Sequence, residues 1–315
     1  MEVIKLQHPH QISQMPPLSV ALGFFDGVHL GHQRVILEAK NEANKLGIKS
    51  GVMTFDPHPS VVLGKSEKHV EYISPIEDKI QIIQDLGIDY LIIVRFSLEF
   101  SHLLPQEFID QYVIGLNIKH VVAGFDYSYG KMGKGTMETI PFHSRDRFTY
   151  TVISKLSIEG EKISSTLIRK LITNGDTDKL PSLLGRYYQT SGKVIHGDKR
   201  GRTIGFPTAN IDLSGEYLLP PIGVYAVRLK VENTWFDGVC NIGYKPTFKK
   251  ENHHKPSIEV HIFNFDKEIY GFFVTIEWHK YIRKEQKFNG IDELVAQIQL
   301  DKEHAMEHLE KISVS

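Results

Sequence analysis

A glycine-rich segment with two histidines lies near the N-terminus, and its residue types suit phosphate chemistry. It reads Gly-Phe-Phe-Asp-Gly-Val-His-Leu-Gly-His over residues 23–32. Glycines let the backbone approach a ligand closely, and a helix starting near Gly31 would offer unpaired N–H groups to an anion. His29 and His32 are three residues apart, so both can face that terminus and donate hydrogen bonds to phosphate. Surface histidines after a turn, or a metal pair completed by Asp26, are the alternatives, but a place between a strand and a helix favours phosphate.

Hydroxyl side chains followed by an arginine form a second candidate for phosphate binding. The segment reads Ile-Ser-Ser-Thr-Leu-Ile-Arg over residues 163–169. Serine and threonine commonly cap helices, so a capped helix with one surface arginine is one interpretation. The hydroxyls, the first helix amides and a bidentate arginine also suit phosphate oxygens. The histidine segment in the same chain favours this second interpretation.

A third segment, residues 192–210, combines glycines with basic side chains. It reads Gly-Lys-Val-Ile-His-Gly-Asp-Lys-Arg-Gly-Arg-Thr-Ile-Gly-Phe-Pro-Thr-Ala-Asn. Amides and cations that converge in such a loop can hold a polyphosphate. A solvated hairpin loop with ordinary surface charges is the alternative, and the segment matches no Walker-type pattern. The glycines are four residues apart, and the basic residues lie between them: Gly197, Lys199, Arg200, Gly201, Arg202 and Gly205.

The end of this segment carries two candidate metal ligands. Thr208 and Asn210 alternate with Ala209, so on an extended backbone both side chains face one side. A hydroxyl and an amide oxygen are suitable ligands for magnesium. The same two residue types also commonly bond backbone groups at turns, which is the alternative.

The elements expected around the first two segments alternate between strands and helices. Apolar runs indicate strands, and apolar residues at helical spacing indicate helices between them. Such alternation predicts a parallel sheet covered by helices on both faces, with the ligand at the carboxyl ends of the strands. The expected strands are residues 19–25, 51–55, 90–94 and 120–124, and the expected helices are residues 31–46, 75–86 and 105–116.

The second half has a different pattern, which predicts a second domain. Short β-rich runs with turns between them indicate an antiparallel barrel or sandwich. A helical stretch over residues 165–184 precedes these runs and a helix over residues 291–311 follows them. A length of 315 residues also favours two domains, which we expect at residues 1–184 and 185–315. The expected strands are residues 189–195, 224–231, 235–242, 258–265 and 272–279.

The composition fits a globular enzyme better than a nucleic-acid or membrane-surface protein. The formal net charge is -1, so no basic excess points to an anionic partner. No apolar stretch is long enough for a signal peptide or a membrane span. Cys240 is the only cysteine, which excludes an internal disulfide and favours a reducing compartment. We therefore expect a cytoplasmic enzyme with no nucleic-acid and no membrane partner, and whether it is a homo-oligomer stays open.

The first half resembles a known family. Gly-x-Phe-Asp-Gly-Val-His-x-Gly-His followed by Ile-Ser-Ser-Thr-x-Ile-Arg is similar to the adenylyltransferase half of the bacterial bifunctional riboflavin kinase/FAD synthetases, within the wider His-x-Gly-His nucleotidylyltransferase superfamily. Residues 54–59, Thr-Phe-Asp-Pro-His-Pro, and residues 124–130, Gly-Phe-Asp-Tyr-Ser-Tyr-Gly, also match. Phe24 stands where the family commonly has asparagine.

The second half resembles the riboflavin kinase half of the same enzymes. The match lies in the glycine-rich segment that ends in Gly-Phe-Pro-Thr-Ala-Asn at residues 205–210. It continues through residues 223–226, 241–243 and 259–263. The resemblance therefore extends over nearly the whole chain, in the order of the family.

This resemblance implies a fold and two reactions. The fold is an α/β parallel-sheet nucleotidyltransferase domain of Rossmann-like type, followed by an antiparallel β-barrel kinase domain with a C-terminal helix. The reactions are phosphorylation of riboflavin to FMN, with ATP converted to ADP, and adenylylation of FMN to FAD with release of pyrophosphate. Retention of only one activity, or a non-catalytic regulator that binds flavin or nucleotide, stays open.

Carried over position by position, the resemblance also implies site residues. Glu259 would be the general base of the kinase, and His29, His32 and Arg169 would act on the ATP phosphates of the other reaction. Thr208 and Asn210 would hold magnesium with ATP. The remaining residues that it implies near nucleotide or flavin are Gly23, Phe25, Asp26, Gly27, Gly31, Asp126, Ser164, Ser165, Thr166, Gly197, Lys199, Gly201, Gly205 and Arg283.

Overall fold

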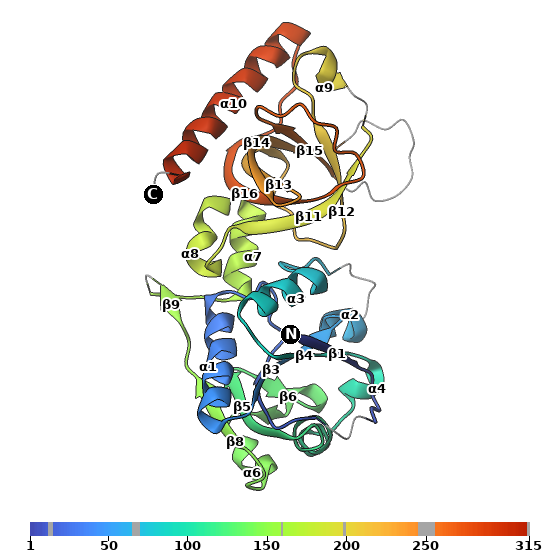
Figure 1. Cartoon of the computed structure of the whole chain (residues 1–315), viewed down its shortest axis with the longest axis vertical. Helices are drawn as coiled ribbons and strands as arrows, with labels where there is room; N and C mark the ends of the chain where they lie inside the picture. Colours follow the sequence, from blue (N-terminus) through green and yellow to red (C-terminus); the bar gives the residue numbers. More distant parts are fainter. Residues whose placement is uncertain (12–14, 65–69, 159, 198–199, 245–255, 314–315) are drawn as a thin grey trace. The chain divides into compact units, whose positions relative to one another are not determined.

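The chain divides into two compact units, Met1–Ser165 and Thr166–Ser315. A computed structural model describes residues 1–11, 15–64, 70–158, 160–197, 200–244 and 256–313 (Figure 1). Each unit is described by itself below. Among the described residues, no helix combines the length and the apolar character that crossing a bilayer requires.

A parallel sheet of six strands forms the centre of the first unit. Its strand order is β1-β4-β3-β2-β5-β8, and every neighbouring pair is parallel. The chain moves outward in one direction through β3 and β4 and in the other through β5 and β8, so the strand order reverses beside β2. Ligands of open α/β sheets bind at the carboxyl ends of the strands at such a point. The strands are β1 Glu2–Leu6, β2 Leu18–Leu22, β3 Lys49–Asp56, β4 Tyr90–Arg95, β5 Ile118–Gly124 and β8 Thr149–Ile153.

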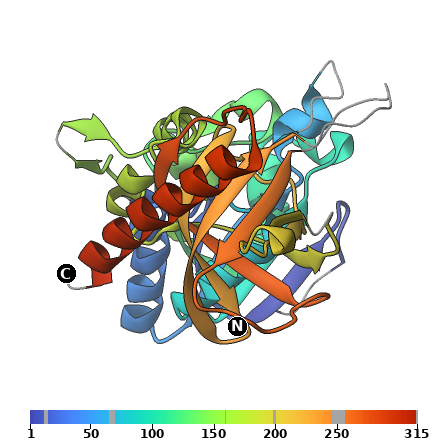
Figure 2. The same cartoon turned by 90° about the horizontal axis from the view of Figure 1, so that it is seen from above.

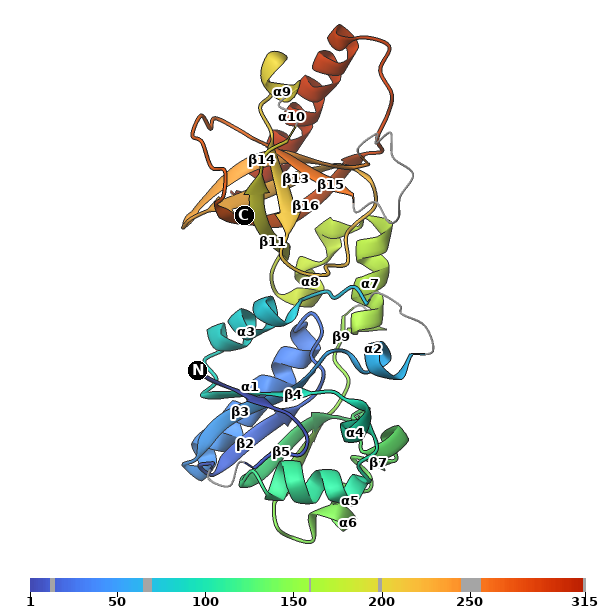
Figure 3. The same ribbon diagram turned by 90° about the vertical axis from the view of Figure 1, so that its right-hand side faces the viewer.

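Helices cover both faces of this sheet (Figure 3). On one face, α1 (Leu30–Leu46) and α3 (Ile76–Asp85) pack against the strands through side chains such as Ile36 and Ile83, both fully buried. On the other face, α5 (Pro105–Phe108) continues directly into a π-helical turn, η1 (Ile109–Ile114), and buries Phe108 and Tyr112. The shorter elements are α2 Pro59–Leu63, α4 Leu98–Ser101, β6 Ser128–Tyr129, η2 Lys131–Gly133, β7 Gly135–Thr136, α6 Ile140–Ser144, β9 Ser157–Ile158 and β10 Glu161–Lys162.

The second unit is a closed antiparallel barrel. Its strand order is β11-β12-β15-β14-β13-β16, and β16 closes the barrel by pairing with β11. Trp278 and Tyr225 are fully buried in it, and Trp278 Nε1 donates to Thr190 Oγ1 at 3.0 Å. The strands are β11 Tyr188–Ile195, β12 Ala209–Leu213, β13 Gly223–Val231, β14 Thr234–Gly243, β15 Ser257–Ile262 and β16 Phe273–Arg283.

Helices precede and follow the barrel strands in the sequence of the second unit. The helix α10 (Ile291–Ser313) lies across its outer surface and contacts β13, β14 and β16 (Figure 2, red). Before β11 come α7 (Ser165–Asn174), the 3-10 turn η3 (Thr177–Lys179) and α8 (Pro181–Leu184), and η3 packs on β16. A further short helix, α9 (Arg200–Thr203), follows β11.

The predicted fold class is confirmed: a parallel α/β domain precedes an antiparallel barrel with a C-terminal helix. Contacts group residues 166–184 with the barrel. The domain boundary that the sequence suggests, between residues 184 and 185, stays a prediction.

Candidate active sites

The loop between β2 and α1 has an unusual backbone. Phe25 has a φ of 55° and Val28 a φ of 38°, in the left-handed region that non-glycine residues rarely adopt. Gly27, with a φ of 81°, has the same hand. Such conformations persist only where the surroundings hold them. The loop is therefore a shaped element, and its fixed geometry leads directly into the N-terminus of α1.

Asp26 supplies part of that support. Its Oδ1 accepts hydrogen bonds from Ile73 N at 3.0 Å and Ser74 N at 3.2 Å, and its backbone oxygen accepts one from Ser165 Oγ at 3.0 Å. The side chain is buried, with 4% exposure. Asp26 thus joins the loop to two distant segments. Its expected contact with nucleotide stays a prediction, because the carboxylate is turned toward the protein.

His29 and His32 lie together at the start of α1. The rings stack at a centroid distance of 3.6 Å and an angle of 18°. His29 is the N-cap of the helix, and its Nδ1 accepts a hydrogen bond from His32 N at 3.2 Å. Because Nδ1 is an acceptor, a neutral His29 carries its proton on Nε2. That N–H can donate to a phosphate oxygen.

His32 is held in its neutral form. Burial lowers the pKa of His32 well below 6.5, and the positive charges of His29, Lys79 and Lys162 lower it further. Its Nδ1 is buried without a hydrogen-bond partner among the described residues. Near neutral pH His32 therefore acts through hydrogen bonds and not as a full charge.

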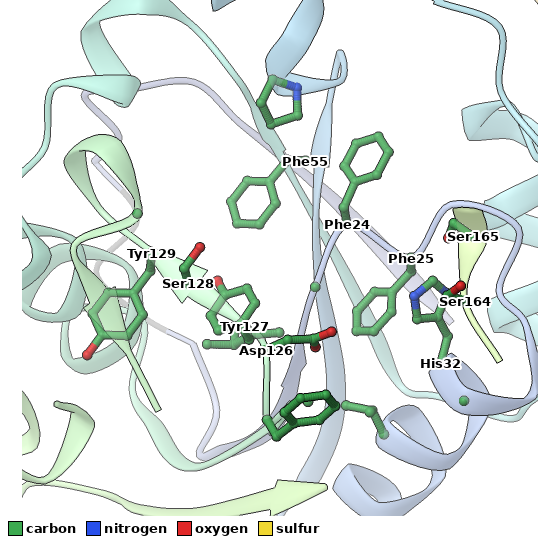
Figure 4. A pocket seen from close by; sticks show the side chains of 18 of the residues that line it. Phe24, Phe25, His32, Phe55, Asp126, Tyr127, Ser128, Tyr129, Ser164 and Ser165 are labelled. Carbon is green, nitrogen blue, oxygen red and sulfur yellow. The ribbon is translucent and has the colours of Figure 1, made fainter. Parts of the chain in front are cut away.

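A cavity of about 570 Å³ opens beside the histidines, a size typical of small-molecule sites. Figure 4 shows His32, Ser164 and Ser165 grouped at one side. Tyr127 and Tyr129 lie at the other side (Figure 4). The rest of the lining is mixed, and it includes seven phenylalanines: Phe24, Phe25, Phe55, Phe96, Phe100, Phe108 and Phe125. The cavity thus has a polar end suited to phosphates and an aromatic end suited to a flat ring system.

A lysine that the motifs did not single out also borders this cavity. Lys162 Nζ lies 2.6 Å from Asp126 Oδ2 and 4.7 Å from the centre of the Phe125 ring. The ion pair is largely exposed, so it contributes little to stability. The lysine can therefore exchange its carboxylate for a phosphate at low cost. It lies one residue before the segment at 163–169, which is the signal that would have found it.

The structure brings most of the predicted residues of the first site together. Eight of them line the cavity: Gly23, Phe25, His29, Gly31, His32, Asp126, Ser164 and Ser165. Gly27 packs against Ile73 instead, where an added Cβ would lie 2.8 Å from Ile73 Cγ2. Thr166 and Arg169 lie on α7 in the second unit, so their roles at this site stay predictions.

The barrel carries a second polar group around Glu259. This residue lies in β15, which runs between β12 and β14, and it is paired with Asn210 on one side and Asn241 on the other. Thr208 Oγ1 donates to Glu259 Oε2 at 3.4 Å. A carboxylate, a hydroxyl and two amides therefore lie close together on β15, β14 and β12 and on the residue that precedes β12.

Thr208 borders two cavities of the barrel. One has a volume of about 300 Å³ and contains Glu259, with apolar walls from Phe288, Leu294 and Ile298. The other, of about 440 Å³, contains the cations Arg202 and Lys267 and the ring of Tyr270. Arg202 also lies close to Tyr270, with 3.4 Å between its Nη2 and the phenolic oxygen. Two ligands, one bound in each cavity, would therefore come closest to each other beside Thr208.

Close packing fixes the glycine-rich loop against Asn210. A Cβ added at Gly197 would lie 2.2 Å from Asn210 Nδ2, and one added at Gly201 would lie 2.2 Å from Phe206 O. Gly205 has a φ of 83°, a left-handed conformation that favours glycine. At each of these three positions, steric constraints thus favour glycine over residues with a Cβ. The predicted contact of Lys199 with nucleotide lies outside the described residues.

Arg283 has a structural partner that the sequence did not suggest. Its guanidinium forms two hydrogen bonds with Asp301 of α10, at 2.8 Å and 2.7 Å, and Asp301 is 3% exposed. Both residues also line the 300 Å³ cavity. Arg283 therefore holds α10 against the barrel beside the cavity, and its predicted contact with flavin stays a prediction.

Comparison with known proteins identifies both halves. The FAD synthetase family model matches residues 11–167, and the riboflavin kinase family model matches residues 184–309. The chain is 50% identical over 314 residues to the bifunctional riboflavin kinase/FMN adenylyltransferase of Bacillus subtilis (strain 168), covering 99% of both chains. The chain belongs to this family. Proteins of the same name from Listeria monocytogenes (48% identity, 96% of both chains) and Escherichia coli K12 (35%, 95% of both chains) are also similar.

A solved structure resembles the whole chain as well. It is described as a macrolide-efflux protein from Streptococcus pneumoniae, with a TM-score of 0.86, 33% identity, and coverage of 96% of this chain and 99% of the other. Membership of the bifunctional family rests on the two family models and the curated relatives. Within those matches, the 570 Å³ cavity falls in the FAD synthetase part and Glu259 in the riboflavin kinase part.

Proposed function

We infer that this chain phosphorylates riboflavin to FMN with one ATP and joins FMN to the adenylyl group of a second ATP, giving FAD and pyrophosphate. The observation that carries this conclusion is the presence of both family domains in order over nearly the whole chain. Each domain has its own cavity, lined by the polar residue types that its reaction needs.

In the first unit, we propose that FMN occupies the aromatic end of the 570 Å³ cavity and ATP the polar end. A phosphate oxygen of FMN attacks the α-phosphorus of ATP, the new P–O–P bond forms, and the bond to pyrophosphate breaks. No protein nucleophile is needed, so catalysis consists of alignment and charge stabilisation. His29 Nε2–H and the α1 terminus donate to the phosphates, and Ser164, Ser165 and Lys162 add further donors. The stacking of the histidines and the neutral form of His32 support this role.

In the barrel, we propose that riboflavin occupies the 300 Å³ cavity and ATP the 440 Å³ cavity. The apolar walls of the first suit the flavin ring. In the second, Asp266 and Glu268 balance the charges of Arg202 and Lys267, and the ring of Tyr270 offers a face on which the base of a nucleotide can stack. The ribityl 5′-hydroxyl oxygen attacks the γ-phosphorus, its proton passes to Glu259, and ADP leaves. The position of Thr208 between both cavities supports this assignment.

Magnesium is the metal that we propose for the kinase site. Oxygen atoms are the donors that this ion prefers, and three oxygen-bearing side chains lie close together here. Asn210 and Glu259 are paired across two strands, and the Thr208 hydroxyl bonds to Glu259. Thr208 and Asn210 would hold the ion together with ATP phosphates, and the bound ion would neutralise phosphate charge. The protein residues then need only to orient the hydroxyl and accept its proton.

The proposed function is tested by incubating the purified chain with riboflavin, ATP and magnesium and following the flavins by chromatography. FMN should form first and FAD after it, because the product of the kinase is the substrate of the adenylyltransferase. FMN without later FAD, also when FMN is supplied directly, would contradict the second activity. Absence of both products would contradict the enzyme assignment as a whole.

A further inference from the structure

A buried lysine lies behind the loop of the first site. Lys79 is on α3, and its side chain is 2% exposed. Its Nζ donates to the backbone oxygen of Phe24 at 2.8 Å and lies 4.3 Å from the centre of the Phe24 ring. Lysine is rarely buried without a partner of opposite charge, because transfer of the ammonium from water is costly.

No such partner is bound to the ammonium. Among the described residues, no carboxylate lies within ion-pair distance of Lys79, and the ammonium contacts the backbone oxygen and the ring of Phe24. Asp26 and Asp56 attract the charge only from a distance, and burial lowers the pKa of Lys79 to about 8. In the part of the chain that the structure describes, the ammonium is therefore attracted by two carboxylates but paired with neither.

The hydrogen bond itself does not explain why the lysine is present. Thr54 Oγ1 donates to the same Phe24 oxygen, also at 2.8 Å. That carbonyl therefore stays satisfied without Lys79, so an apolar side chain of similar length would fill the space at no cost in unpaired groups. What only a cation provides at this position is charge.

The charge acts toward the catalytic loop. Lys79 contributes to the lowered pKa of His32, so its field reaches the histidine pair. Lys79 also contacts Phe24 directly, and Phe24 immediately precedes Phe25, which has a left-handed backbone conformation. A triphosphate bound at the histidines would supply negative charge near the ammonium, which has no ion-pair partner among the described residues.

We propose that Lys79 is a positioning residue for adenylyl transfer: its ammonium is held against Phe24, and its charge acts there on the loop of the histidines as a counter-charge for the phosphates of ATP. Lys79 does not line the cavity and acts through its neighbours. The proposal rests on the proposed adenylyl transfer, and neither the family motifs nor the sequence pattern assigned this residue a role.

The first test is Lys79→Met in the full-length chain, which keeps the side-chain length and removes the ammonium. We expect the turnover number for FMN-to-FAD conversion to fall at least about tenfold, while riboflavin phosphorylation in the same sample stays within about twofold. The melting temperature should stay the same or rise, because a buried unpaired charge is lost. A lysine with a merely structural role would lower the melting temperature and would not separate the two activities.

Lys40→Met is the matched control. Lys40 Nζ likewise donates to a backbone oxygen, that of Leu86, at 2.9 Å, but it does so at the other end of α3. FAD formation should be unchanged in this variant. Wild-type FAD formation in Lys79→Met, or an equal fall in Lys40→Met, would overturn the proposal. A wild-type chain that makes no FAD would instead overturn the proposed function, and the role of Lys79 with it.

Lys79→Arg provides a measurement that does not depend on the methionine variant folding. In the wild type, FAD formation should fall as the pH rises through about 8, where the ammonium loses its charge. A guanidinium stays charged there, so this alkaline decrease should disappear in the arginine variant. The same decrease in both proteins, or none in the wild type, would contradict the proposal.

The groups that face the ammonium do not confuse this measurement. Asp26 and Asp56 attract its charge, and His32 is already neutral at that pH. His58 and Tyr72 also lie near the Phe24 ring, at 4.4 Å and 6.4 Å between ring centroids. All of these are identical in both proteins, so a difference between the profiles reports on residue 79.

Discussion

The two histidines of the proposed adenylyltransferase site are not equivalent residues. His29 caps α1 and has a fixed tautomer, whereas His32 is kept neutral by its surroundings. A group whose pKa is lowered by folding has a consequence for stability, because the unfolded chain then binds protons that the folded chain does not.

We predict that acidification destabilises the protein through His32. Below about pH 6.5 the unfolded imidazole is protonated while the folded one stays neutral, so the free energy of unfolding falls as the pH falls toward the folded-state pKa. Urea unfolding at about pH 7.5 and about pH 5.5 tests this. His32→Gln should lose less stability than the wild type over this range. Equal losses in the two proteins would show that His32 does not contribute, since the other histidines are common to both.

The contact between Gly197 and Asn210 predicts a separate effect on the kinase. In Gly197→Ala the new Cβ would lie within 2.7 Å of three side-chain atoms of Asn210, so the amide must move from its place beside Glu259. We expect riboflavin phosphorylation to fall about tenfold or more, as for other displaced site residues.

Gly290→Ala is the control for that substitution, because a Cβ there meets nothing within 4 Å. It should leave both activities unchanged. Comparable kinase rates in Gly197→Ala and Gly290→Ala would contradict the role given to Asn210. The rates are measured from FMN formation with riboflavin and ATP.

At the scale of elements, α10 is the part of the barrel unit whose attachment can be tested most simply. Leu294 and Ile298 of this helix form apolar walls of the proposed riboflavin cavity. The buried ion pair between Arg283 and Asp301 joins the helix to β16 beside them. Loss of the pair should therefore affect both the stability of the barrel and the shape of the cavity.

We predict that Asp301→Ala lowers the free energy of unfolding by about 3 kcal/mol, since it leaves a largely buried guanidinium without its partner. The KM for riboflavin should rise as the wall formed by α10 loosens. Asp237→Ala is the control: this residue pairs with Arg228 at 2.8 Å but is 43% exposed, so its loss should cost less than about 1 kcal/mol. Chemical denaturation of both variants measures the difference, and equal costs would contradict the assignment.

The elements also explain how far the sequence alone could predict the fold. The helix expected over residues 31–46 is found as α1 at Leu30–Leu46, because its apolar spacing is regular and Gly47 ends it with a φ of 66°. The strands β1 and β8 were missed. Both lie at the edges of the sheet, and β8 has no fully buried residue, so neither has the continuous apolar run of a central parallel strand.

Site residues were predictable where they share a motif and not where the fold alone brings them together. The histidines, the serines and Thr208, which the motifs singled out, all line cavities, while their roles stay predictions. Lys79 is separated from Phe24 by 55 positions and Asp301 from Arg283 by 18, so no local spacing connects them. One signal was available for Lys79: it stands on the buried face of its helix, one turn before Ile83.

At the scale of the whole molecule, the two proposed reactions use separate sets of residues. All residues that line the 570 Å³ cavity fall between positions 22 and 165, and all that line the two kinase cavities fall between positions 194 and 301. Substitutions in one set should therefore leave the other reaction nearly unchanged, as expected for sites that share no partners. The chain thus carries two reactions, each at a site of its own.

The most direct test compares Glu259→Gln with the double variant His29→Asn/His32→Gln, assaying each with riboflavin and with FMN. Asparagine can still cap α1, and both changes preserve side-chain size approximately. We predict that Glu259→Gln loses riboflavin phosphorylation by about 100-fold or more and keeps FMN adenylylation, and that the histidine variant shows the reverse. Loss of both activities in either variant, with an unchanged melting temperature, would contradict two separate sites.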